Sequence, residues 1–161
     1  MTDVAIRLAT GADAPPIGAL VEALARGFVL PGQSPEARQR LLAWLSADAI
    51  AARIALGHRH HVAECDGAVV GVVGTRDECH LHLLFVDARH QRRGIARALW
   101  QVARDACLEA GGHGRITVNA SGNAVPAYLQ LGFTQLGPPE AREGIITTPM
   151  AFDLSPARLR E

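Results

Sequence analysis

The sequence predicts an α+β domain (an α/β sandwich), with a mixed, mostly antiparallel sheet and helices on both faces. Three observations carry this prediction. Strand-like and helical segments follow one another along the chain without a repeat or a linker. Asp66-Gly67 joins two β-rich segments and is a two-residue hairpin signal. A single strand–helix–strand unit around Gly94 requires one parallel crossover inside the otherwise antiparallel sheet.

Length and composition favour one domain over residues 1–161. The chain is 48% hydrophobic, which is enough to bury a core without disulfides. Sixteen basic residues balance sixteen acidic ones, so no net field attracts nucleic acid or anionic lipid. Cys65, Cys79 and Cys107 show no paired spacing, which favours a reducing compartment. No signal peptide or apolar run of about 18 residues is evident, so a cytoplasmic protein without a membrane or nucleic-acid partner is expected.

The first half of the chain predicts one strand and two helical stretches. The strand covers residues 4–8, and apolar residues at helical spacing indicate a helix over 12–29. Ser34 and Pro35 suit the N-cap and first position of a second helix that reaches about Leu56. A break near Ser46 is left open, because Ala47-Asp48 is able to begin a separate turn.

The second half predicts the sheet. Strands are expected over residues 61–65, 68–74, 80–86 and 115–120, with a closing hairpin of 133–136 and 145–154 around a polar loop. A helix is expected from Gly94 to Ala110, ended by Gly111-Gly112. A shorter helix over 123–131 ends at Gly132, with Asn123 as its N-cap and Pro126 at its third position.

The loop between the strand 80–86 and the long helix predicts a site for a phosphorylated ligand. It reads Gln91-Arg92-Arg93-Gly94-Ile95-Ala96. Glycine lets the backbone approach a phosphate closely, and successive N–H groups at a helix N-terminus attract negative charge. Neither the dinucleotide fingerprint G-x-G-x-x-G nor a P-loop is present.

The pattern Gln91-x-x-Gly94-x-Ala96 resembles the pyrophosphate-binding motif of the GNAT superfamily of acyl-CoA N-acyltransferases. The strand sequence LLFVD before the loop, ITVNA after the helix, and Tyr128 with Gly132-Phe133 match the same family. The resemblance covers nearly the whole chain. It implies the GNAT fold, in which the two central parallel strands splay apart, with acetyl-CoA as co-substrate and no metal. Dimers are frequent among similar proteins, so a homodimer is an open alternative.

The resemblance also implies roles for individual residues. The backbone of Leu84, Phe85 and Val86 would hold the pantetheine arm, with the Leu84 N–H as an oxyanion donor. The N–H groups of Arg92, Arg93, Gly94, Ile95 and Ala96 would point at the pyrophosphate, and Gln91 of the same motif would also contact the cofactor. Ser121 stands where the family often has an Asn, so either Ser121 or Asn123 is expected to contact the cofactor. Tyr128 matches the acid that protonates the leaving thiolate; the alternative is that it only packs.

The general base is expected to be His80 or His82. Strand alternation predicts that His80, His82, Leu84 and Val86 share one face. Many family members carry a Glu near this position, whereas here Glu78 lies in the connection before the strand. An imidazole with a pKa near 6.5 would take the amine proton, so activity should rise through its titration. The alternative is that both histidines pack in a half-buried strand. The cluster His58, His60 and His61 is interpreted as a solvated strand end.

The function predicted is transfer of an acetyl group from acetyl-CoA to a primary amine, by direct attack in a ternary complex. The acceptor, a small molecule or a peptide or protein, would lie between Phe28–Gln33 and the loop near Glu140 and Glu143. Those two carboxylates would favour a cationic acceptor. A non-catalytic acyl-CoA-binding sensor is the alternative, and a nucleotide-binding protein of another kind is a third hypothesis.

Overall fold

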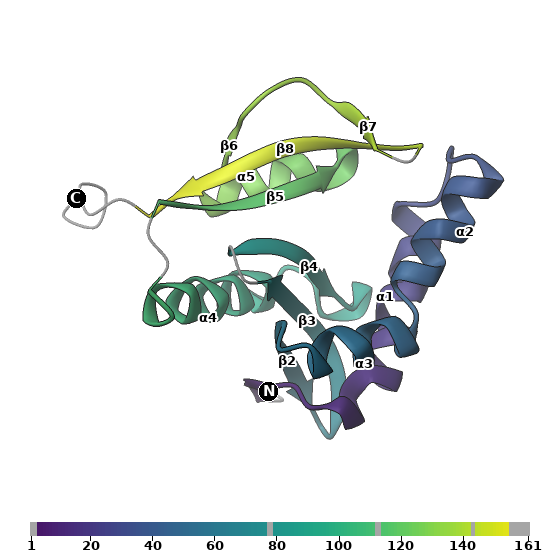
Figure 1. Cartoon of the computed structure of the whole chain (residues 1–161). Coiled ribbons are helices and arrows are strands. Elements are labelled where there is room, and N and C mark those ends of the chain that lie inside the picture. The colour runs from purple at the N-terminus through teal and green to yellow at the C-terminus, as the bar shows by residue number, and fades with distance from the viewer. Residues whose placement is uncertain (1–2, 77–78, 112–113, 143, 155–161) are drawn as a thin grey trace.

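The computed structural model describes residues 3–76, 79–111, 114–142 and 144–154. Within these ranges eight strands form one sheet in the order β1-β2-β3-β4-β5-β8-β6, and β7 pairs with β8 (Figure 1). The strands are β1 (Val4–Leu8), β2 (Arg59–Cys65), β3 (Ala68–Arg76), β4 (His80–Val86), β5 (Arg115–Ser121), β6 (Thr134–Gln135), β7 (Glu140–Arg142) and β8 (Ile145–Asp153). The predicted α+β fold class is confirmed.

The helices are α1 (Ala14–Phe28), α2 (Pro35–Trp44), α3 (Ala47–Ala55), α4 (Ile95–Glu109) and α5 (Val125–Leu131). The break near Ser46 separates α2 from α3. Ser34 and Ser46 are the N-caps of these two helices, and their hydroxyls accept hydrogen bonds from the Ala37 and Ala49 N–H groups. No helix of the described residues has the length and apolar character to cross a membrane.

The hairpin between β2 and β3 turns at Asp66-Gly67, as predicted. Asp66 has φ 52° and Gly67 has φ 78°. Two consecutive residues with positive φ are what a type I′ turn requires, and its twist matches that of the flanking strands.

The central strands β4 and β5 are the one parallel pair in the described sheet, and they pair only where they begin. His80 lies opposite Thr117, and Leu81 lies opposite Val118. The two strands diverge beyond that point (Figure 1). The later residues of β4 therefore keep backbone groups on their β5 side that no described strand uses.

A β-bulge at His82 corrects the predicted face of β4. Thr75 pairs with Leu81 and Gly74 with Leu83, so His82 is the extra residue. The bulge reverses the alternation after His82. His80 and His82 stay on one side, whereas Leu84 and Val86 turn towards the α4 core. The prediction that all four share a face was wrong for this reason.

Two hydrophobic cores lie on opposite faces of the sheet. One is built around Trp100 and Leu99 of α4 together with Phe133. The other is built around Ile17 and Val21 of α1 with Ile50 of α3. The predicted placement of helices on both faces is confirmed, and the sheet holds β4 between the two layers.

Two local predictions need correction. Asn123 is not the N-cap of α5, because a 3₁₀ turn over Gly122–Ala124 precedes it and Ser121 caps that turn. Pro126 consequently occupies the second helical position, where a missing N–H is tolerated. The polar loop before β8 also contains a strand, β7, which folds back along β8.

Candidate active site

The loop before α4 has the backbone shape of an anion cradle. Arg92 has φ 64° and Gly94, the N-cap of α4, has φ 80°. Left-handed residues in such a turn direct successive N–H groups to one side. The Gln91 side-chain amide donates a hydrogen bond of 3.0 Å to the Val86 carbonyl, which ties the loop to the end of β4.

A cavity of about 600 Å³ lies against this loop, between α4 and α5. Most residues predicted to hold the cofactor line it: Leu84, Phe85, Val86, Gln91, Arg92, Gly94, Ile95, Ala96, Ser121 and Asn123. Arg93 is absent from its lining. A Cβ at Gly94 would meet no atom within 4 Å, so the space above the loop is open to a ligand.

Ser121 and Asn123 act together at this cavity. The Ser121 hydroxyl donates to Asn123 Oδ1 at 2.9 Å, and Asn123 Nδ2 donates to the Phe28 carbonyl at 3.0 Å. The pair therefore joins the end of β5 to the end of α1, whichever of the two meets a ligand.

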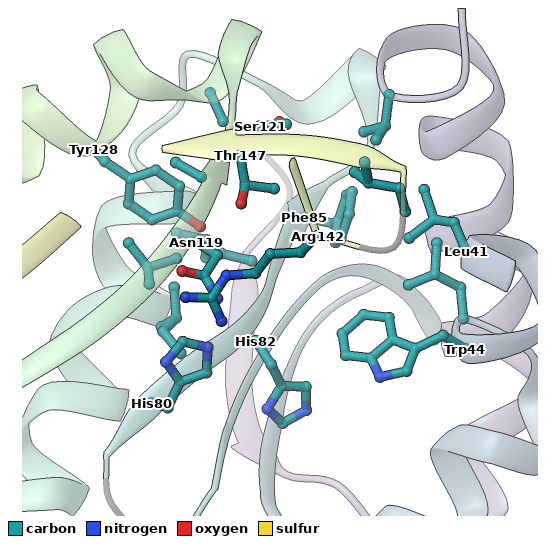
Figure 2. Close-up of a pocket in the computed structure, with 18 of the residues that line it drawn as sticks. Leu41, Trp44, His80, His82, Phe85, Asn119, Ser121, Tyr128, Arg142 and Thr147 are labelled. Atoms are coloured by element: carbon teal, nitrogen blue, oxygen red, sulfur yellow. The ribbon is translucent and has the colours of Figure 1, made fainter. Parts of the chain in front are cut away.

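A second cavity, of about 790 Å³, lies between α2 and the β7–β8 hairpin (Figure 2). It meets the first cavity where β4 and β5 diverge. Six residues line both: Val29, Leu84, Phe85, Ser121, Ala124 and Tyr128. The site thus has two compartments that share a junction beside Tyr128.

Tyr128 projects from α5 towards this junction (Figure 2). Its ring packs at 5.3 Å from that of Phe133. Burial raises the pKa of the phenol above its ordinary value, so the hydroxyl stays protonated. Within the described residues the hydroxyl has no hydrogen-bond partner, and Tyr128 lines both compartments.

His80 and His82 both line the second cavity, as predicted (Figure 2). His80 Nδ1 lies 2.8 Å from Thr117 Oγ1 on β5. Its other ring nitrogen, Nε2, makes no hydrogen bond with a described residue.

The ring nitrogens of His82 are less available. His60 Nδ1 lies 3.2 Å from the His58 carbonyl, which only accepts, so His60 Nδ1 carries the proton and its Nε2 is an acceptor. His82 Nε2, 3.2 Å from His60 Nε2, must then be the donor. That leaves His82 Nδ1 as an unprotonated nitrogen, buried and without a partner.

Glycine at position 74 permits this contact. A Cβ there would lie 2.9 Å from both His60 Nε2 and His82 Nε2. His60 is 1% exposed, so interpreting the 58–61 cluster as a solvated strand end was wrong for this residue. The error arose because His60 lies opposite Gly74 of β3, and its ring packs against that of His82 across this glycine.

Burial sets the protonation of these imidazoles. It lowers the pKa of His60 to about 4 and that of His80 to about 4, the latter with help from the positive charges of Arg76 and Arg142. Burial and the neighbouring His60 lower the pKa of His82 to about 3. All three are neutral at pH 7. The described residues contain no group of three or more His, Cys, Asp or Glu placed to hold a metal ion.

Sequence reasoning missed Arg142 and Trp44, which line the second cavity. Arg142 lies in a segment interpreted as loop, and Trp44 is one of several apolar residues of its helix. No local signal marks either one. Glu78 and Glu143, named in the sequence-based hypotheses, lie outside the described residues.

The fold is that of an acyltransferase family. A family model described as an acetyltransferase (GNAT) domain matches residues 29–154. The chain therefore belongs to the GNAT family of acetyltransferases. A search of curated proteins gives no match.

Solved structures with the same fold support this assignment. A GCN5-related N-acetyltransferase from Rhodopseudomonas palustris aligns with a TM-score of 0.77 at 22% identity, over 96% of this chain and 98% of that one. The PaiA N-acetyltransferase from Thermoplasma acidophilum, solved with coenzyme A, gives 0.73 at 14%, over 94% and 99%. YncA from Salmonella typhimurium, a putative acetyltransferase solved with acetyl-CoA, gives 0.68 at 22%, over 95% of each chain.

Proposed function

We propose that this protein transfers an acetyl group from acetyl-CoA to a primary amine, by direct attack in a ternary complex. The observation that carries the proposal is the meeting of two cavities at Tyr128. One cavity adjoins a phosphate-type loop, and the other is accessible to a second ligand. A reaction between two bound substrates needs such a junction.

The donor compartment fits acetyl-CoA in its chemistry. The N–H groups of Arg92 to Ala96 and the start of α4 suit a pyrophosphate. The unpaired edge of β4 at Leu84 to Val86 suits the amides of a pantetheine arm. When bound there, acetyl-CoA supplies the activated acetyl group as a thioester.

The protein must then stabilise the oxyanion, protonate the leaving thiolate and accept the amine proton. The Leu84 N–H is the proposed donor to the developing oxyanion. The Tyr128 hydroxyl is the proposed acid for the leaving thiolate, because burial keeps it protonated. A neutral imidazole is the proposed acceptor of the amine proton.

We assign the imidazole to His80 in preference to His82. His80 Nε2 is without a hydrogen bond to the described residues, while His82 Nε2 is engaged by His60 and its Nδ1 is covered. His82 then acts as a wall of the acceptor cavity. The low pKa of His80 makes it a weak base, so its contribution should be modest.

The test of the function is release of the CoA thiol from acetyl-CoA across a panel of primary amines. Turnover of at least one amine, with formation of the N-acetyl product by mass spectrometry, supports the acetyltransferase. Tight CoA binding with no turnover of any amine favours the alternative, a non-catalytic acyl-CoA sensor. Equal binding of adenine nucleotides that lack the pantetheine arm would contradict both.

The protonation of His80 leads to a prediction about pH. Because the neutral imidazole is the base, its contribution is complete well above pH 4 and is lost as the pH falls through about 4. This replaces the expected rise near pH 6.5. We expect His80→Ala to lower kcat/KM roughly tenfold to a hundredfold, the lower part of the range for general bases.

The measurement is the ratio of wild-type to His80→Ala kcat/KM from pH 5 to 9, in which titration of the acceptor amine cancels. The ratio should stay within about a tenth of its pH 7 value down to pH 5, because a pKa of about 4 leaves roughly nine-tenths of the imidazole neutral there. A ratio of one at every pH would remove His80 from the mechanism, and a midpoint near 6.5 would contradict its buried state. His61→Ala, on a histidine that lines neither cavity, is the matched control.

A further inference from the structure

The charges around the second cavity point to the kind of acceptor it takes. Its described lining includes Arg40 and Arg142 but no Asp or Glu. Arg40 makes contacts of its own, so the argument rests on Arg142. A guanidinium is charged at every working pH, and its planar donors match a carboxylate.

Arg142 reaches from β7 into the cavity and lies near Asn119 and His80 (Figure 2). Its one ion-pair partner in the described chain is Glu140, with Nη2 3.9 Å from Oε2. Both side chains are well exposed, 61% for Arg142 and 49% for Glu140, and so loose a pair contributes little. The guanidinium therefore keeps most of its hydrogen-bonding capacity for a ligand. Glu140 itself does not line the cavity.

Arg40 of α2 is charged, but the rest of the cavity wall on the α2 side is apolar. The apolar part is formed by Val29 after α1, by Leu41, Trp44 and Leu45 at α2, and by Phe85 of β4. Trp44 is held in place by Arg53, whose guanidinium lies 4.1 Å from the ring centroid. A ligand that fills this space presents an apolar body to α2 and an anionic group to β7.

We infer that the acceptor is a small amine that carries a carboxylate and an apolar side chain, with the carboxylate bound by Arg142. This deepens the proposed acetyltransferase function and rests on it for the reaction, though binding of the acceptor is a separate property. Arg142 favours an acceptor with an anionic group, whereas the expectation from Glu140 and Glu143 is a cationic acceptor. Glu140 does not line the cavity, and Glu143 lies outside the described residues.

The experiment compares matched acceptors. Phenylalanine and leucine are assayed beside 2-phenylethylamine and 3-methylbutylamine, which lack the carboxylate, and beside 6-aminohexanoate, which carries it at the far end. Binding of the same compounds to the CoA-loaded protein is measured by calorimetry. Each measurement is repeated on Arg142→Gln and on Arg115→Gln, a control at an exposed arginine of β5 that lines neither cavity.

We expect wild type and Arg115→Gln to prefer the carboxylate-bearing amines, and Arg142→Gln to lose that preference. A charge-assisted hydrogen bond of about 1.5–3 kcal/mol corresponds to about a 10- to 150-fold rise in KM or Kd for the carboxylate compounds. The amines without a carboxylate should change little. A better response from 6-aminohexanoate than from phenylalanine or leucine would support binding of the carboxylate and overturn the apolar side chain, because 6-aminohexanoate has none.

Two results overturn the inference: equal binding of carboxylate and decarboxylated amines by wild type, or a preference that persists in Arg142→Gln. Arg142-dependent binding without acetylation would support the acceptor site and count against the proposed reaction alone. Turnover confined to amines without a carboxylate would support the reaction and overturn the inference.

Discussion

Tyr128→Phe is expected to lower kcat for acetyl transfer by about 100-fold or more, with little change in the affinity for acetyl-CoA. The substitution removes one hydroxyl from the junction of the two cavities and keeps the ring that packs on Phe133. Loss of a positioned acid typically costs 10²- to 10⁴-fold. Packing is retained, and within the described residues no hydrogen bond of the hydroxyl is lost, so stability should hold.

The measurements are kcat by thiol release, Kd for acetyl-CoA by calorimetry and Tm by circular dichroism, all on wild type and Tyr128→Phe. Phe133→Leu is the matched control, because it disturbs the same ring packing and leaves the hydroxyl in place. If Tyr128→Phe retained kcat within threefold of wild type, the side chain would only pack, and another group would protonate the thiolate.

Acidification from pH 7 to pH 5 is expected to remove roughly 4–6 kcal/mol from the free energy of unfolding. His60, His80 and His82 are neutral in the folded protein, with pKa values of about 4, 4 and 3, whereas unfolded histidine titrates near 6.5. Below pH 6.5 the unfolded chain binds more protons, so stability falls as the pH falls. Each group contributes up to about 1.4 kcal/mol per pH unit. The total approaches the whole stability of an ordinary domain.

The measurement is urea unfolding at half-unit steps between pH 7.5 and 5. The slope of free energy against pH should decrease by roughly a quarter to a third in His60→Gln, because burial also lowers the pKa of His61, which adds to the slope. A constant change in stability caused by the substitution itself does not alter this slope. Asp13 does not contribute to the change in stability between pH 7.5 and 5. Its pKa is lowered to about 2 by hydrogen bonds from Arg7, so the stability it adds is lost only below its ordinary value of 3.8. A flat profile between pH 7 and 5 would show that these imidazoles are not buried in neutral form.

Much of the fold follows from local signals in the sequence. Ser34-Pro35, Asp66-Gly67 and Gly94 each favour one backbone conformation, and each stands at the predicted boundary. Register is harder to predict, because it depends on pairing between distant segments. The bulge at His82 is set by Gly74 on the neighbouring strand, and it reverses the faces of Leu84 and Val86. The alternation of residues along the β4 sequence does not indicate the bulge.

The candidate site likewise has one half that local sequence signals predict and one half that depends on tertiary structure. The loop 91–96 and Tyr128 belong to short motifs, so the donor half was predictable, although Arg93 does not line the cavity. The acceptor half is assembled from α2, β4, β5 and β7, which are far apart in the chain. Arg142 and Trp44 are recognised as site residues only in the tertiary structure, which brings them to one cavity. The buried contact between His60 and His82 likewise depends on β3, which lies between β2 and β4 and has Gly74 at the contact.

The central claim is that acetyl-CoA binds between α4 and α5 with its acetyl group at the junction beside Tyr128. A crystal structure of the protein with acetyl-CoA tests it most directly. We expect the pyrophosphate against the N–H groups of Arg92 to Ala96, the pantetheine arm along Leu84 to Val86, and the thioester within hydrogen-bond reach of the Tyr128 hydroxyl. A pyrophosphate bound away from the loop, or a thioester far from Tyr128, would contradict it.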